Sequence, residues 1–252
     1  MSIREIKLDA KEFLRGKWTM AAVVAFIYNM IIGAASSVFS GALYFVEALE
    51  MSEVVIAIIY ILNFAVTFIV QSAVLLGFMT IMMKIAAGRS FSVGELFSCT
   101  SSTMKVFGLT ITIFIKVLLW SFLLVIPGII KGLSYSMAFY ILADDPTKSV
   151  KQCIDESKEM MKGNKGKLFG LQLSFMGWVL LMYAVIIIPF LVLIPLAKML
   201  GPMIVLLLCL IILALFVFIC VGMYVLMVYM EVSRVTFYFD IKQNQRKDVM
   251  YD

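Results

Sequence analysis

One lysine, Lys116, lies where a charged side chain is costly. It comes ten residues into an apolar run that begins at Val106, and a lysine near the middle of a bilayer costs about 2.5–3.5 kcal/mol to insert. Asn63, Thr67 and Gln71 follow one another at four-residue spacing in another apolar run, so they share one face of a helix. Two interpretations remain open. These residues form a polar pocket or conduction path with Lys116, or they hold helices together while Lys116 snorkels to the membrane surface.

Charged residues near membrane edges suggest anchoring and docking. Glu231 and Arg234 are three residues apart, so on a helix they can pair on one face. We interpret the pair as an interfacial anchor, with a part in a gate as the alternative. Between residues 146 and 162, carboxylates alternate with lysines at helical spacing, which is typical of a solvated helix face. This helix is a candidate docking surface for a protein partner.

The composition argues against catalysis. The chain has no histidine, and its four cysteines lack the close spacing of a zinc or iron–sulfur site. It contains no Gly-rich phosphate loop, nucleophile elbow or H-E-x-x-H motif. We therefore expect no enzyme activity, catalytic residue, metal or cofactor. The net charge of +5 does not indicate nucleic acid, because the basic residues lie at the edges of apolar runs, where anionic lipid headgroups are the expected partner.

Apolar runs dominate the chain, which is 63% hydrophobic with a mean hydropathy of +1.05. A membrane span needs about 20 apolar residues. The sequence offers such runs at 19–44, 54–83, 106–126, 168–196 and from 202 to 229, and a shorter one at 129–143. We predict an all-α fold, a polytopic bundle of six transmembrane helices with cytoplasmic amphipathic helices. Whether residues 129–143 span fully or re-enter stays open.

These helices are predicted to form a single domain over residues 1–242. It includes an interfacial helix over 3–17 and a cytoplasmic helical loop over 144–167, and a polar cytoplasmic tail follows at 243–252. Pro127 and Gly128 are expected to break the chain between the third and fourth spans. Asp145 is the predicted N-cap of the loop helix, with Pro146 in its first turn.

The distribution of Lys and Arg predicts the orientation. Five lie before the first span, three between the second and third, six between residues 144 and 167, and four from Arg234 onward. The opposite side has only Lys131 and Lys198. The positive-inside rule therefore places both termini and the 144–167 loop in the cytoplasm.

Small residues recur every four positions in three of the predicted helices. Such stripes let helix backbones approach closely, so we interpret them as packing faces, with a homodimer contact as the alternative. The three stripes are Gly33, Ser37 and Gly41; Gly128, Gly132 and Ser136; and Gly166, Gly170 and Ser174.

Four segments resemble a known family. They are PGIIKGLSYSMAFYILADDP (127–146), SKEMMKGNKGKLFGLQLSFMGW (157–178), AKEFLRGKW (10–18) and FYFDI (237–241). Together they resemble an uncharacterised bacterial integral-membrane family, domain of unknown function 975, over nearly the whole chain. The chain departs from the family pattern at Tyr229-Met230-Glu231, where a Pro-Tyr pair is expected. The resemblance implies a multi-pass protein of the bacterial cytoplasmic membrane and brings no catalytic residues.

Two functions therefore remain open. The favoured one is a non-enzymatic membrane component: a scaffold, an accessory subunit, or an envelope-stress or peptide-resistance protein. The alternative is a transporter or flippase of a lipid or small amphiphile, which Lys116 and the polar stripe would serve.

Overall fold

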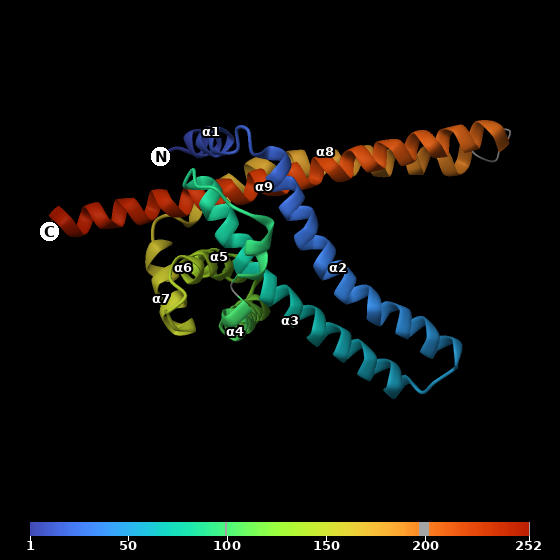
Figure 1. The fold of residues 1–252 in the computed structure, drawn as a ribbon, viewed down its shortest axis with the longest axis horizontal. Helices are drawn as coiled ribbons and strands as arrows, with labels where there is room; N and C mark the ends of the chain where they lie inside the picture. The colour runs from blue at the N-terminus through green and yellow to red at the C-terminus, as the bar shows by residue number, and fades with distance from the viewer. Residues whose placement is uncertain (99, 197–201, 252) are drawn as a thin grey trace.

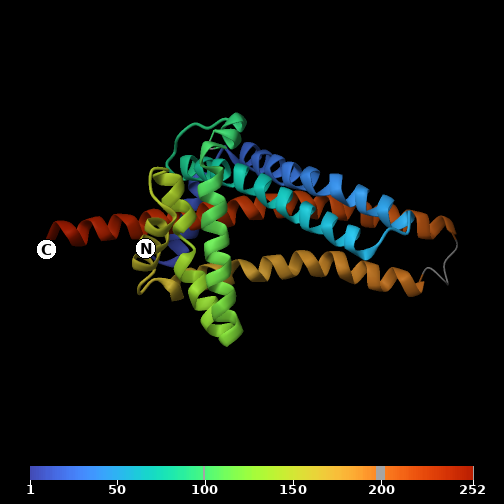
Figure 2. The same cartoon turned by 90° about the horizontal axis from the view of Figure 1, so that it is seen from below.

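The computed structural model describes residues 1–98, 100–196 and 202–251, which are helical almost throughout and contain no strand. The helices are α1 (Ile3–Phe13), α2 (Trp18–Ala48), α3 (Glu53–Ala86), η1 (Val93–Phe97), η2 (Thr100–Ser102), α4 (Thr103–Leu123), α5 (Val125–Tyr135), α6 (Ala138–Asp144), α7 (Val150–Met160), α8 (Lys165–Leu196) and α9 (Pro202–Tyr251). Three pairs pack as hairpins: α2 with α3, α4 with α5, and α8 with α9. The hairpins diverge from one another (Figure 1), and α4 crosses the long axis of α9 steeply (Figure 2).

Six segments of the described chain are long and apolar enough to span a membrane, which confirms the predicted number. They are Trp18–Val46, Glu53–Ala86, Thr103–Leu123, Val125–Asp144, Lys165–Pro189 and Met203–Gln245. The fourth segment begins and breaks at other residues than predicted. The chain turns at Leu124, whose backbone is extended, and Pro127 lies in the first turn of α5. That position needs no amide hydrogen, so this proline starts a helix instead of breaking one.

The break in the fourth segment falls instead at Ser136 and Met137, between α5 and α6. Ser157 of α7 satisfies backbone groups there: its hydroxyl donates to the carbonyl of Ser134 at 2.9 Å and accepts from the amide of Met137 at 3.2 Å. Helix ends leave such groups without partners inside the helix. A buried hydroxyl on a neighbouring helix therefore stabilises the interruption.

The helix of the polar loop begins later than predicted. Ser149 caps α7 by accepting from the amide of Gln152, whose side chain accepts from the Ser149 amide in return. The predicted cap, Asp145, accepts instead from the amide and hydroxyl of Thr147, and these bonds lower the pKa of its carboxyl. The pattern Ser-x-x-Gln is a capping box and was the better signal in the sequence.

The last helix is also longer than predicted. α9 has 50 residues and remains helical to Tyr251, so the helix continues into the predicted polar tail, beyond the span, which ends at Gln245. At about 1.5 Å per residue, α9 is about 75 Å long, more than twice the roughly 30 Å of a hydrocarbon core.

The buried core lies at one end of the molecule. We call this region the hub. It consists of the apolar face of α1, the first turns of α2, the last turns of α3, the first turns of α4, all of α6 and α7, the first turns of α8, and residues 226–241 of α9. Both chain termini lie at this end (Figure 1). Away from it, the three hairpins expose their apolar side chains.

Candidate functional site

A largely buried cluster, an ion pair of α9 with a tyrosine of α6, joins these two helices in the hub. Glu231 on α9 accepts from the Tyr140 hydroxyl of α6 at 2.5 Å and from Arg234, one turn further along α9, at 3.1 Å. Glu231 is 8% exposed and Tyr140 is 2% exposed. The pairing of Glu231 with Arg234 is confirmed, and the third partner, Tyr140, was not foreseen.

A second group ties the C-terminal half of α9 to α8 and to the amino group of the first residue. Asp240 accepts from Lys167 of α8 at 3.0 Å and from the amino group of Met1 at 3.2 Å. Its side chain is largely buried, whereas the two cations are each about a quarter to a third exposed. A buried carboxylate with two charged partners is well compensated. These bonds connect segments that are distant in the sequence.

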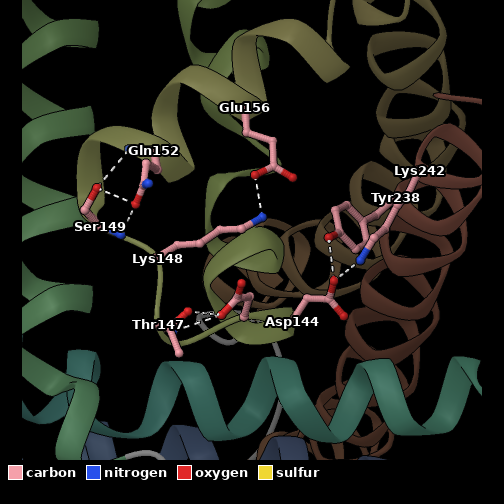
Figure 3. A network of polar contacts seen from close by, with 9 residues as sticks. Asp144, Thr147, Lys148, Ser149, Gln152, Glu156, Tyr238 and Lys242 are labelled. Carbon is pink, nitrogen blue, oxygen red and sulfur yellow. Dashed lines mark hydrogen bonds and ion pairs between the residues drawn. The ribbon is translucent and has the colours of Figure 1, made fainter. Parts of the chain in front are cut away.

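A third group joins α9 to the end of α6. Asp144 accepts from the Tyr238 hydroxyl and from the Lys242 ammonium, both of α9 (Figure 3). The ring of Tyr238 also stacks on that of Tyr140, with centroids 5.8 Å apart. On the next loop, Lys148 pairs with Glu156 of α7 at 2.5 Å. Charged contacts therefore tie α6, α8 and the N-terminal Met1 to one helix, α9, and the Lys148–Glu156 pair ties α7 to the loop before it.

Backbone contact brings a further element into the hub. The position of a side-chain carbon on Gly77 of α3 would lie 2.2 Å from the carbonyl oxygen of Leu96 in η1. No side chain fits in such a space, so glycine is required for η1 to pack on α3. Nothing in the spacing of Gly77 in the sequence marked it.

Carboxylates in the hub are engaged in ion pairs. Three of its carboxylates, Glu231, Asp240 and Asp144, are buried or half-buried and are each already paired with a cation. Among the described residues, no buried side-chain nitrogen or oxygen lacks a partner. The same part of the chain has no group of three or more His, Cys, Asp or Glu placed to hold a metal.

The predicted intramembrane polar residues are distributed over two hairpins. The Lys116 ammonium of α4 lies 5.9 Å from the ring centroid of Tyr135 in α5. On α3, the Thr67 hydroxyl donates to the Asn63 amide oxygen at 3.1 Å, and the Gln71 side chain lies near the hydroxyl of Tyr28 in α2. Each group therefore finds a partner within its own hairpin. These contacts fit the packing interpretation, and among the described residues no hydrogen bond or ion pair joins Lys116 to the stripe.

The three small-residue stripes are used unevenly. Side-chain positions at Gly33, Gly41, Gly132 and Gly166 have no heavy atom within 4 Å, whereas one on Gly170 would meet Ile3 of α1. One on Gly128 would lie 2.1 Å from the Ser121 hydroxyl, so the α4–α5 turn depends on that glycine. The hydroxyls of Ser37, Ser136 and Ser174 each bond to a carbonyl of their own chain segment.

A comparison with family models matches residues 1–245 to the family described as protein of unknown function (DUF975). The chain belongs to this family. No curated protein and no solved structure matches it. The resemblance expected from the sequence is thereby confirmed over nearly the whole chain.

The four segments that carry the DUF975 resemblance meet in the hub. Residues 127–146 supply Tyr140 and Asp144, and residues 157–178 supply Ser157 and Lys167. Residues 10–18 supply the buried Ala10 and Leu14, and residues 237–241 supply Tyr238 and Asp240. Segments separated by up to about two hundred residues thus form one packed structure.

Proposed function

We propose that the protein is a non-enzymatic scaffold of the bacterial cytoplasmic membrane, with the hub on the cytoplasmic side. One observation carries the proposal: the four family-like segments converge on a single buried, ion-paired hub. Their side chains are engaged with one another, which suits a rigid platform better than a reaction centre. The exposed face of α7 is the expected docking surface for a partner protein. The surrounding hairpins anchor this platform in lipid.

Site-specific photo-cross-linking in intact cells tests this role. A photoreactive residue replaces Lys162, just after α7, where the lysine side chain is 70% exposed. The matched control replaces Phe122 at the α4–α5 turn, which is 81% exposed. A scaffold should give a discrete protein adduct from position 162 and lipid adducts from position 122. Lipid adducts alone from both positions would contradict the proposal.

The proposed orientation rests on the basic segments, which gather at the hub end, and on the positive-inside rule. The natural thiol at Cys153 is a poor probe of orientation, because it is buried and burial raises its pKa. We predict that, in a cysteine-free background, Glu50→Cys reacts with an impermeant thiol reagent in intact cells. Lys162→Cys should react only after the cells are opened. Labelling of Lys162→Cys from outside would reverse the orientation.

Transport or flipping of a lipid or small amphiphile is the second candidate. It is favoured by a groove of about 590 Å³ formed largely by α8 and α9. Reconstitution into vesicles with a fluorescent phospholipid and an external quencher tests it. A scaffold should leave the rate of lipid transfer between leaflets at the value of empty vesicles. A protein-dependent acceleration would favour the transport role.

A further inference from the structure

Two apolar grooves lie on either side of the same part of α9. The larger, about 590 Å³, is walled by Trp178 and Met182 of α8 and by α9 from Phe218 to Tyr229. The smaller, about 340 Å³, lies between α9 and the start of α2, where Ala22 and Phe26 contribute. The lining of both is predominantly apolar.

The two grooves share a dividing wall. Trp18, Val221 and Val225 line both of them. The Trp18 ring packs edge-on against Tyr229, with centroids 5.9 Å apart, at the hub end of the wall. The grooves therefore begin side by side and flank the wall along α9. This arrangement suits a molecule with two apolar chains joined at one head.

One cation, Lys7, lines the larger groove at its hub end. Lys7 of α1 places its ammonium 3.2 Å from the Ser174 hydroxyl and 4.3 Å from the centre of the Phe175 ring. Its backbone carbonyl is held by the Tyr229 hydroxyl at 3.0 Å. An ammonium has three hydrogens to donate, so one bond to Ser174 leaves capacity for an anionic ligand. No carboxylate shares in lining this groove among the described residues.

The length of the larger groove along α9 matches the thickness of one membrane leaflet. Phe218 and Tyr229 are eleven residues apart, which is about 16 Å along a helix. That is about half of the roughly 30 Å hydrocarbon core. Trp18, Trp178 and Tyr229 contribute aromatic rings, and Lys7 lies at the hub end, where phosphate groups of a leaflet would be expected.

We propose that these grooves bind an anionic diacyl phospholipid from the leaflet next to the hub. Its phosphate lies at Lys7, and one acyl chain lies in each groove, on either side of Trp18 and Val225. The charge of the site selects the anionic headgroup, and the divided apolar wall selects two chains. The site does not depend on the scaffold role, because it requires no protein partner.

The protein carries a suitable probe. Of its three tryptophans, Trp18 and Trp178 line the larger groove, and Trp120 lies elsewhere, in α4. In a Trp120→Phe background, fluorescence therefore reports only on the groove. The protein is placed in phosphatidylcholine nanodiscs that contain increasing fractions of phosphatidylglycerol with brominated acyl chains, which quench tryptophan. Brominated phosphatidylcholine at the same fractions is the reference.

We expect brominated phosphatidylglycerol to reach half-maximal quenching at about one-fifth of the fraction that brominated phosphatidylcholine needs, since one lysine near an anionic headgroup supplies about that factor. Lys7→Gln should remove this preference, because glutamine keeps a donor for Ser174 and loses the charge. Lys11→Gln, on the exposed side of the same helix, should keep it. Equal quenching by both lipids in the parent protein would overturn the proposal, as would equal losses in both variants.

A second pair of variants tests the grooves apart from the charge. Val225→Phe fills the wall that both grooves share, and Val217→Phe adds the same volume to an exposed position of α9 that lines neither. Only Val225→Phe should weaken quenching at low phosphatidylglycerol. Protection of both tryptophans from every brominated lipid would mean that another protein chain fills the grooves, and would overturn the lipid site. None of these outcomes depends on the cross-link expected at position 162.

Discussion

The hub and the hairpins of this protein are organised in opposite ways. In the most apolar stretch of α3 no residue is buried, whereas 44% of the corresponding stretch of Val125–Asp144, which includes α6, is buried. Lipid tails are as apolar as leucine, so hairpins in a bilayer gain little by packing closely. The hub contains charged and backbone groups that need defined partners. Specific tertiary structure is therefore concentrated where polar groups must be satisfied.

The largest expected effect comes from breaking the buried ion pair. Arg234→Ala leaves the Glu231 carboxylate buried with only Tyr140, which should destabilise the hub by about 3–5 kcal/mol. Thermal unfolding in mild detergent, followed by circular dichroism, measures this. The double variant Glu231→Gln with Arg234→Met removes both charges and should regain much of the loss. A double variant as unstable as Arg234→Ala would show that the charge itself is not the cause.

A matched pair of leucines compares the two regions directly. Leu142 in α6 is fully buried, whereas Leu123 at the α4–α5 turn is 71% exposed. Leu142→Ala should cost about 2–5 kcal/mol through the cavity that it leaves. Leu123→Ala should leave the melting temperature in detergent nearly unchanged. Similar losses at both sites would mean that the hairpins are packed as specifically as the hub.

Two glycines allow the same comparison at the level of the backbone. Gly77→Ala forces η1 away from α3 and should destabilise the protein by about 1–3 kcal/mol. Gly132→Ala places a methyl group in open space on α5 and should be neutral or slightly stabilising, because alanine favours a helix. Melting temperatures of the two variants are the measurement. A loss at Gly132 would show that this stripe contacts another chain.

The smallest expected effect concerns Lys116. Lys116→Met removes a contact with Tyr135 and relieves an intramembrane charge, so its net effect should be within about 1 kcal/mol. A double-mutant cycle in detergent separates the two interpretations of this lysine. Coupling with Tyr135→Leu should be measurable, and coupling with Gln71→Leu should lie within the roughly 0.3–0.5 kcal/mol expected of independent sites. Strong coupling with Gln71 would restore the pocket hypothesis.

The spans could be predicted because the signal for them is local. Hydropathy is a property of about 20 consecutive residues, and the predicted runs agree with α2, α3, α4 and α8 to within a few residues. The fourth segment was harder. Its interruption at Ser136 and Met137 is held by Ser157, a residue of another helix. No local pattern contains that information.

The hub could be predicted only in part. Glu231 and Arg234 are close in the sequence, so their pairing followed from helix geometry. Asp240 and Lys167 meet only because α8 and α9 pack together. Small-residue spacing was a weak guide for a similar reason: it shows that a backbone could approach Gly33 or Gly132, and it does not show whether one does. The position of Lys116 in an apolar run likewise did not show that its ring partner would be Tyr135 of the same hairpin.

The position of α9 after the other helices in the chain has a consequence for biosynthesis. Tyr140 precedes its partner Glu231 by 91 residues, and Lys7 precedes Tyr229, whose hydroxyl bonds to its carbonyl, by 222 residues. Chains grow at about 5–20 residues per second, so the earlier segments are made many seconds before their partners exist. The spans can enter the membrane one after another, but the hub can close only when α9 emerges from the ribosome. A pause in translation within α9 would therefore prolong a state in which the first two hairpins and α8 are inserted and the hub is still unassembled.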